Sequence, residues 1–155
     1  MPVRNSIIKI ISTFFYVGYL PLIPGTFGSI AGLFLFYLLH HNAFIYAASL
    51  LALMLLGFLT CGEAEQIFQK KDARYIVIDE VIGMLLSLLF IPYDIKLVVI
   101  AFFLFRLLDT LKPYPAGKLQ GLRGSIGIIS DDIIAGLYTN IILQAVLRLA
   151  SLRTA

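Results

Sequence analysis

The sequence predicts an all-α fold: a polytopic membrane helical bundle of about four to five transmembrane helices, preceded by an N-terminal interfacial helix. Hydrophobic residues make up 60% of the 155 residues, and the mean hydropathy is +0.95, both high for an ordinary soluble domain. A small soluble domain leaves much of its surface exposed and could not hide this much apolar area. The apolar residues also gather in runs separated by prolines and charges. The length favours one domain over residues 1–155.

Charge is scarce in this chain, which limits the classes of partner. Only 14% of the residues are charged, and the net charge is +3 with the Lys and Arg dispersed. This balance does not indicate a nucleic-acid partner and suits a protein that faces an anionic cytoplasmic leaflet. Cys61 is the only cysteine, so an internal disulfide is excluded. We therefore expect membrane lipid and no nucleic acid as partners, with the oligomeric state left open.

The first apolar stretch, Ser6–Leu20, predicts an interfacial helix. It is interrupted by Lys9 and Gly18 and ends at Pro21. Such a mixed stretch fits a helix that lies in the membrane surface better than one that spans it.

The next segment, Pro24–Ser29, reads Pro-Gly-Thr-Phe-Gly-Ser and opens into an apolar run. Backbone amides and hydroxyls at a glycine-rich helix start could cradle an anion. The alternative is an ordinary helix start with Thr26 or Ser29 as N-cap. The helix over Phe27–Leu39 would rise only about 20 Å, against a hydrocarbon core of roughly 30 Å.

The remainder of the chain contains the clearer predicted spans. They are Phe44–Cys61, Ile76–Ile91, Ile95–Leu111 and Ile126–Leu149. A polar connection that begins at Glu63 and Glu65 is expected after the first of them. Pro92 ends the second, and a loop rich in Pro, Gly and Lys, Lys112–Gly124, separates the last two.

The distribution of Lys and Arg predicts five spans with the N-terminus in the cytoplasm. In this orientation six acidic residues lie at the cytoplasmic ends of their helices, although they come from separate elements. They are Glu63, Asp79, Glu80, Asp109, Asp131 and Asp132. Ionisable groups at the edge of lipid-facing helices are expensive and indicate a functional site.

Clustered carboxylates repel one another and hold protons unless a cation neutralises them, so the pattern predicts a hard divalent ion, Mg²⁺ above all. Adjacent residues on a helix are about 100° apart, so we expect one acid of each adjacent pair to point fully inward. Arg106 and Lys112 would then be free to bind phosphate, the first as a fork and the second as a point charge.

Structural interpretations compete with this one. Arg106 and Asp109 could form an ion pair that ties a helix end to its neighbour, and Asp131-Asp132 could cap a helix. Other phosphatase chemistries fit less well. Cys61 has no Arg six residues on, and His40 and His41 are predicted on the far face. Metal-assisted attack by water is left, with an aspartyl-phosphate route as the alternative.

Four blocks of sequence then occur in a fixed order along nearly the whole chain. They are Pro24–Ser29, Ile76–Glu80, Arg106-x-x-Asp109-x-x-Lys112-Pro113-x-Pro115 and Gly124-x-x-Gly127-Ile128-x-x-Asp131-Asp132-x-x-Ala135-Gly136. Together they resemble the phosphatidylglycerophosphatase A family. The resemblance implies a membrane-bound, Mg²⁺-dependent phosphatase of phospholipid biosynthesis that hydrolyses phosphatidylglycerophosphate to phosphatidylglycerol and phosphate.

The resemblance also implies roles for individual residues. The expected catalytic acids are Asp79, Glu80, Asp109, Asp131 and Asp132, and all of these except Asp109 are expected to hold the metal. The expected phosphate-binding residues are Gly25, Thr26, Arg106 and Lys112. With the predicted orientation, the active site faces the cytoplasmic side of the cell inner membrane. A small polytopic transporter or ion-binding protein that uses the same acidic cluster is the alternative, but the far halves of the predicted spans carry no charge.

Overall fold

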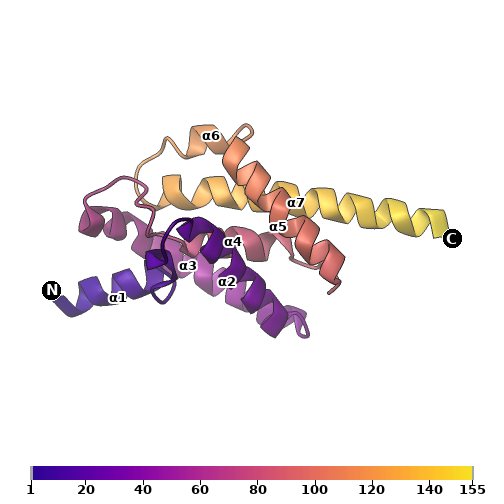
Figure 1. Cartoon of the computed structure of the whole chain (residues 1–155), viewed down its shortest axis with the longest axis horizontal. Coiled ribbons are helices and arrows are strands. Elements are labelled where there is room, and N and C mark those ends of the chain that lie inside the picture. The colour runs from indigo at the N-terminus through magenta and orange to yellow at the C-terminus, as the bar shows by residue number, and fades with distance from the viewer. Residues whose placement is uncertain (1, 155) are drawn as a thin grey trace.

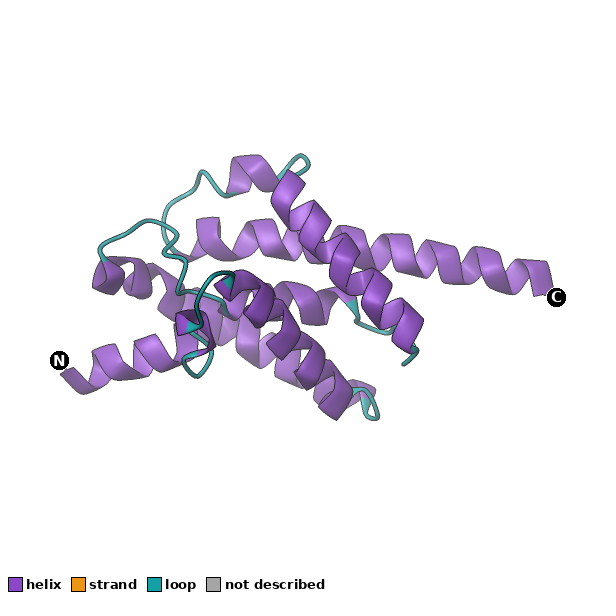
Figure 2. Cartoon of the chain, viewed as in Figure 1, coloured by secondary structure: helices purple, strands orange, loops and turns teal. Residues whose placement is uncertain are grey.

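The computed structural model describes residues 2–154, and every regular element in that range is helical, which confirms the all-α class (Figures 1 and 2). The elements follow in the order α1 (Pro2–Ser12), the 3-10 turn η1 (Val17–Tyr19), α2 (Pro24–Leu39), α3 (Ala43–Phe68), α4 (Ile78–Ser87), α5 (Ile95–Leu111), α6 (Ala116–Leu119) and α7 (Ser125–Thr154).

Two helices are long and apolar enough to cross a membrane. They are α3, with 26 residues, and residues 125–152 of α7. Only 28% and 22% of their most apolar windows are buried within the protein, so most of this apolar surface faces outward. On α3 the side chains of Leu51, Leu55 and Leu59 form an exposed stripe at a spacing of four residues. Helix length among residues 2–154 therefore does not confirm the predicted count of four to five spans.

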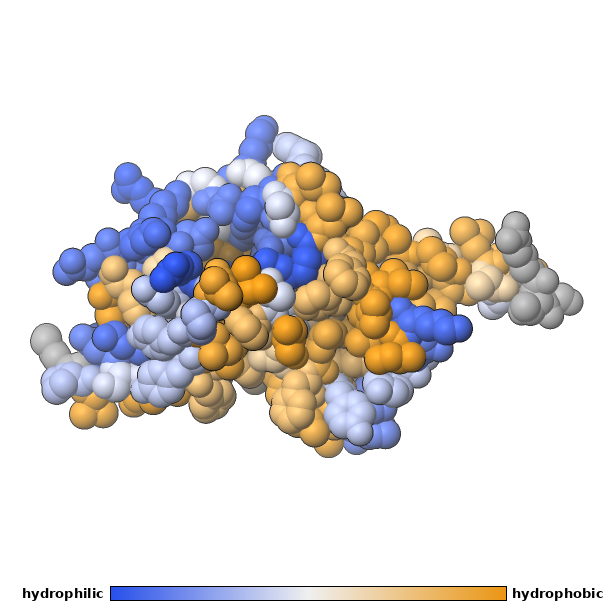
Figure 3. Space-filling view, in the orientation of Figure 1, coloured by the Kyte–Doolittle hydropathy of each residue, from blue (hydrophilic) through white to orange (hydrophobic). Residues whose placement is uncertain are grey.

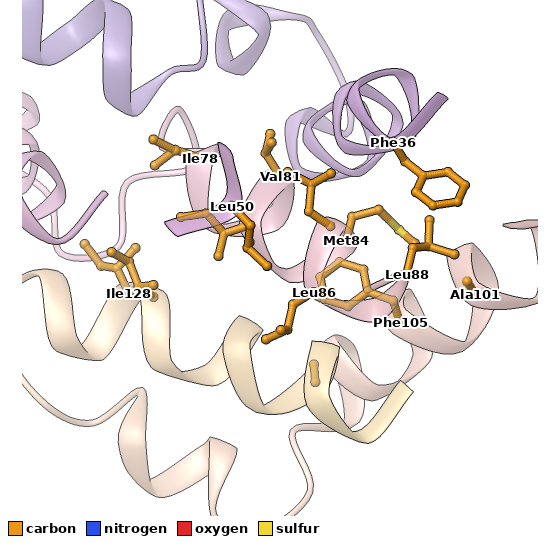
Figure 4. Close-up of a cluster of buried hydrophobic side chains, with 14 of the residues drawn as sticks. Phe36, Leu50, Ile78, Val81, Met84, Leu86, Leu88, Ala101, Phe105 and Ile128 are labelled. Carbon is orange, nitrogen blue, oxygen red and sulfur yellow. The ribbon is translucent and has the colours of Figure 1, made fainter. Parts of the chain in front are cut away.

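The predicted span over residues 76–91 is wrong as a continuous helix. The helix there, α4, has only 10 residues, a rise of about 15 Å. All of its residues except Glu80 are buried, and Val81 and Met84 lie in the hydrophobic core with Phe36 of α2 and Phe105 of α5 (Figure 4). The apolar run thus reflects burial by protein on every side and not contact with lipid.

Side chains from two neighbouring helices satisfy the carbonyl groups at the end of α4. The hydroxyl of Tyr46 on α3 donates to the carbonyl oxygen of Leu85 at 2.5 Å. The amide of Asn140 on α7 donates to the carbonyl oxygens of Ser87 at 3.1 Å and Leu89 at 2.8 Å. The last carbonyls of a helix have no intrahelical partner, so these bonds let α4 end inside the protein.

Helix α5 has the predicted bounds. Its first residue follows Asp94, whose carboxylate accepts hydrogen bonds from the amides of Lys96 and Leu97. Helix α3 is longer than predicted. It continues to Phe68, so Glu63 and Glu65 lie within the helix and not in a polar connection.

The Pro24–Ser29 segment is helical from its first residue, and neither expected cap is present. Ile23 precedes α2 without a side-chain cap, and the hydroxyl of Ser29 donates to the Gly25 carbonyl at 3.1 Å. The N-cap interpretation for Thr26 or Ser29 is therefore wrong. Helix α1 also ends earlier than predicted, at Ser12, and an irregular turn leads from it to α2.

Close approach of α4 and α7 brings two acidic elements together. A Cβ atom on Gly136 would lie 2.6 Å from the carbonyl oxygen of Gly83, and one on Gly83 would lie 2.9 Å from that of Asp132. Hydrophilic side chains gather around α6 and the end of α3, and hydrophobic ones cover α5 and the far part of α7 (Figure 3). The molecule thus has a polar end and an apolar body.

Candidate active site

Acidic side chains from three helices converge at the polar end. Asp79 and Glu80 lie in the first turn of α4, and Asp109 lies in the last turn of α5. Asp131 and Asp132 lie further into α7. Carboxylate oxygens of Asp79, Glu80 and Asp132 lie within 4.8 Å of one another, and so do those of Asp109, Asp131 and Asp132. The structure therefore brings all five expected acids into one cluster, with Asp132 common to both groups.

Both members of each adjacent acidic pair enter the cluster, so the residue expected to point fully inward is joined there by its neighbour. Asp79, Asp131 and Asp132 are 6%, 5% and 3% exposed. A helix with a single inward face would direct only one of two adjacent residues fully toward the cluster. Helix α4 is enclosed on most sides, and α7 lies between α4 and α5, so neighbouring residues face protein in both directions.

Several oxygens of this cluster lack a hydrogen-bond partner. They are Oδ1 of Asp79, Oε2 of Glu80 and Oδ1 of Asp131, all buried. Buried polar groups are normally hydrogen-bonded, because an unpaired one loses its interaction with water. Unpaired carboxylate oxygens that converge are the donor set that a hard divalent cation takes.

Two cations from α5 and its C-terminal end pair with acids of the cluster. The Nη1 atom of Arg106 lies 2.9 Å from Oδ2 of Asp109. The ammonium of Lys112 donates a hydrogen bond to Asp131 and lies 3.9 Å from Oδ1 of Asp109. Burial lowers the pKa of Lys112, but the hydrogen bond and the charge of Asp131 outweigh burial, so the net pKa is raised. The sequence suggested that both cations would be free to bind phosphate. In the structure, each of them already contacts an acidic side chain.

The start of α2 touches the cluster through Gly25. A Cβ atom at this position would lie 2.3 Å from Oε1 of Glu80 and 3.4 Å from Nη2 of Arg106. Only glycine leaves room for the carboxylate here. Thr26 is half-buried in the same turn, and its hydroxyl has no hydrogen bond to the acids in the described part of the chain.

Other residues considered from the sequence lie apart from the cluster. Glu63 pairs with Arg4 at the surface. Helix α7 begins at Ser125, so Asp131 and Asp132 lie well inside it and the capping interpretation is wrong. Sequence reasoning missed Asn140, although an amide side chain within an apolar helix is a signal that could have found it.

The fold and the site define an all-helical protein with two helices suited to crossing a membrane and a buried carboxylate centre at its polar end. The family model described as Phosphatidylglycerophosphatase A matches residues 10–147. The chain belongs to this phosphatase family.

Individual relatives agree with this assignment. The chain is 33% identical over 125 residues to a phosphatidylglycerophosphatase A of Escherichia coli K12, covering 79% of this chain and 73% of that protein. It is 34% identical over 129 residues to one of Haemophilus influenzae Rd, covering 79% and 78%. A provisionally named phosphatidylinositol-3-phosphatase of Bacteroides thetaiotaomicron is 31% identical over 143 residues, covering 86% and 89%. No solved structure matches the chain.

Proposed function

We propose that the acidic cluster hydrolyses the phosphomonoester of phosphatidylglycerophosphate and releases phosphatidylglycerol and phosphate. The family and the names of two relatives support this substrate. One structural observation carries the chemistry: three buried carboxylate oxygens in a single cluster have no partner. Such a site is costly to maintain unless it binds something.

The residues present fit Mg²⁺. The proposed ligands are Asp79, Glu80, Asp131 and Asp132, because they contribute every unpaired buried oxygen and the acid common to both oxygen groups. Asp109 forms an ion pair with Arg106 and lies near Lys112, so its role is to position these two cations. Bound there, the ion would supply electrostatic stabilisation of a phosphoryl group and a more acidic water.

The cationic residues bind and orient the phosphate. Arg106 uses Nη1 for Asp109 and retains further N–H donors of its planar fork. Its Nη2 lies at the start of α2, 3.4 Å from where a Cβ of Gly25 would stand. Lys112, at the end of α5, adds a point charge next to Asp131. Thr26 lies next to Gly25 in the same turn and would add a hydroxyl donor.

Hydrolysis forms a bond from water oxygen to phosphorus and breaks the bond from phosphorus to the lipid oxygen. Asp79, Glu80 and Asp132 make no ion pair among the described residues, and a carboxylate oxygen of this group that does not bind the ion would accept the proton of the attacking water. The proton is then available for the departing lipid alcohol. Attack by a carboxylate to form an aspartyl-phosphate is the competing route.

We further propose a multi-pass protein of the inner membrane with the site on the cytoplasmic side. Helices α2 and α5, with 16 and 17 residues, are close to the length of a span and expose apolar side chains such as Phe34 and Phe103. The crossing that begins with α4 would be completed by residues 88–94. Non-helical backbone is tolerated in a membrane where protein buries it.

Phosphate release from purified protein in mixed micelles tests the function. We expect hydrolysis of phosphatidylglycerophosphate with Mg²⁺ and little without it, and an inactive Asp132→Asn variant. Phosphatidylinositol 3-phosphate is the comparison substrate, because one relative is named for it. A higher kcat/KM on that lipid would overturn the proposed substrate, and equal rates after metal removal would overturn the proposed cofactor.

A further inference from the structure

The turn between α1 and α2, residues 13–23, exposes large apolar side chains at the polar end of the molecule. Phe15 is 72% exposed, Leu22 is 92% exposed, and Tyr16 and Ile23 are also open. In Figure 2 this turn is the teal segment that lies against the start of α2. A contiguous apolar patch among polar surroundings indicates an interaction surface.

The backbone holds these side chains outward in an unfavourable conformation. Phe15, Tyr16 and Leu22 have φ values of 53°, 69° and 75°. Bulky L-residues rarely adopt the left-handed region, and such outliers persist where the surroundings impose them and function uses them. Leu22 is almost fully exposed, so packing within the described chain does not compensate for its conformation.

The turn is nevertheless held firmly. The amide of Val77 donates to the carbonyl of Ser12 at 3.0 Å. Gly18 packs so closely on the segment before α4 that a Cβ there would lie 1.9 Å from the carbonyl oxygen of Tyr75. The hydroxyl of Thr13 accepts a hydrogen bond from the Tyr16 amide at 3.1 Å. Tyr75 and Val77, which hold the turn, directly precede Asp79 and Glu80 in the sequence.

Aromatic rings and cations surround the base of the turn and form what we term the aromatic belt: Lys9, Tyr16, Tyr19, Phe68, Arg74 and Tyr75. The rings of Tyr19 and Tyr75 are 5.2 Å apart. The guanidinium of Arg74 lies 5.2 Å from the Tyr75 ring, and the Lys9 ammonium lies 6.0 Å from the Phe68 ring. Tyr with Lys and Arg is the composition found at the headgroup level of a membrane.

The turn also ends at the acidic site. Ile23 immediately precedes α2, and Gly25 lies against Glu80 and Arg106. A lipid whose phosphate lay at Arg106 would therefore have its acyl chains near the exposed side chains of Leu22 and Ile23. The exposed side chains of Leu22 and Ile23 thus lie within three residues of Gly25, which contacts the acidic cluster.

We propose that residues 13–23 form a membrane hook. The aromatic belt lies among the lipid headgroups. Leu22 projects into the acyl layer beside the start of α2, where it contacts the chains of the lipid to be hydrolysed. The occupant is the acyl region of a lipid leaflet. The role in hydrolysis rests on the proposed function, but insertion into the leaflet does not.

A fluorescence measurement tests the insertion alone. The chain has no Trp, so Leu22→Trp introduces the only indole. In vesicles of phosphatidylcholine and phosphatidylglycerol, we expect blue-shifted emission and strong quenching by lipids brominated on the acyl chains. Leu122→Trp, on the loop before α7, is the matched control and should emit as a water-exposed indole. Phe15→Trp is the second variant if Leu22→Trp fails to fold. Emission and quenching equal to those of the control would overturn the hook.

A kinetic measurement tests the contact with substrate. Leu22→Asn removes the apolar side chain but suits the left-handed backbone, because Asn tolerates that region. We expect kcat/KM on phosphatidylglycerophosphate in vesicles to fall roughly ten-fold, in line with the loss of one buried leucine. The rate on the deacylated phosphomonoester should stay unchanged. Equal losses on both substrates would make Leu22 structural and overturn the acyl contact. If wild-type protein hydrolyses neither, the proposed function fails, and the fluorescence result still decides whether the turn inserts.

Discussion

The Nη1 atom of Arg106 lies 2.9 Å from Oδ2 of Asp109, one turn further along α5. The other terminal nitrogen of the same guanidinium points toward the start of α2, 3.4 Å from where a Cβ of Gly25 would stand. Arg106 thus forms a structural ion pair and also faces the space proposed for the phosphate. The two roles use different nitrogens and can be separated by mutation.

Arg106→Lys keeps the charge and loses the planar fork. We expect this variant to fold normally and to lose roughly ten-fold or more in kcat/KM, in keeping with about 1.5–3 kcal/mol for a hydrogen bond to a charged group. Initial rates of phosphate release across substrate concentrations measure the effect.

The matched control is the double variant Arg106→Leu/Asp109→Leu. If the pair were only structural, removing both partners would relieve the unpaired carboxylate left by Arg106→Leu and restore activity. We expect no recovery, because the phosphate ligand is still missing. Recovery to near wild-type rates would make the pair structural.

Asp132 belongs to both groups of carboxylate oxygens, whereas Asp131 is held by Lys112. We therefore expect Asp132→Asn to abolish activity and Asp131→Asn to reduce it less severely. Calorimetric titration with Mg²⁺ supplies a readout independent of turnover, and the Asp132→Asn variant should bind the ion much more weakly. Wild-type affinity in both variants would contradict the metal role.

Gly25 and Gly28 lie one turn apart on α2. We expect Gly25→Ala to lower mainly the activity and Gly28→Ala to lower mainly the stability. At Gly25 the new methyl meets the mobile end of Glu80 at 2.3 Å, so the carboxylate moves and activity falls at little cost in stability. At Gly28 it meets the backbone oxygen of Val77 at 3.0 Å, so overpacking costs about 1–3 kcal/mol and lowers Tm. Thermal melts and rates on both variants check this; equal effects on Tm would contradict it.

Asn140 donates to two carbonyl groups at the end of α4. Asn140→Leu leaves both without that partner, and we expect a loss of about 1–3 kcal/mol in stability, seen as a lower Tm in detergent. Gln144→Leu is the control, because Gln144 lies one turn further along α7 and has no hydrogen-bond partner within the described residues. An equal fall in Tm for the two variants would show that the carbonyl bonds are not the cause.

The orientation in the membrane can be tested with single cysteines in a Cys61→Ser background. Lys71 and Gly121 are neighbours at the polar end, where the Lys71 ammonium lies 3.4 Å from the Gly121 carbonyl oxygen. Asn42 lies in the connection from the C-terminal end of α2 to α3, far along the chain from the start of α2 at Gly25. An impermeant thiol reagent applied to intact cells should label Cys at position 42 and spare positions 71 and 121. The opposite pattern would mean an inverted orientation.

The sequence predicted some helices well and others poorly for identifiable reasons. The bounds of α5 were correct because Asp94 caps its start and Pro113 closely follows its end. Helix α3 was predicted too short, because charges end a hydropathy window but do not end a helix. Glu63 remains helical and turns to the surface, where it pairs with Arg4.

The site was predicted as a set but not in its detail. All five acids were identified because each lies at the polar end of its helix, a property that residue order alone displays. The pairing of Lys112 with Asp131 was not foreseen, since it joins α5 to α7 across 19 positions and depends on how those helices pack. The length of α4 was also missed, because hydropathy reports exclusion from water and does not distinguish protein from lipid.

The shortness of α4 has a consequence for how the protein is made. With 10 residues and two acids in its first turn, α4 is too short to partition into the bilayer as an independent segment during synthesis. It is held by the helices packed around it, among which α3 and α7 supply Tyr46 and Asn140 to its end. Because α7 is synthesised after α4, Asp79 and Glu80 reach their final positions only once α7 has been made. The acidic cluster is therefore assembled only after α4 and α7 have both been synthesised and have packed together.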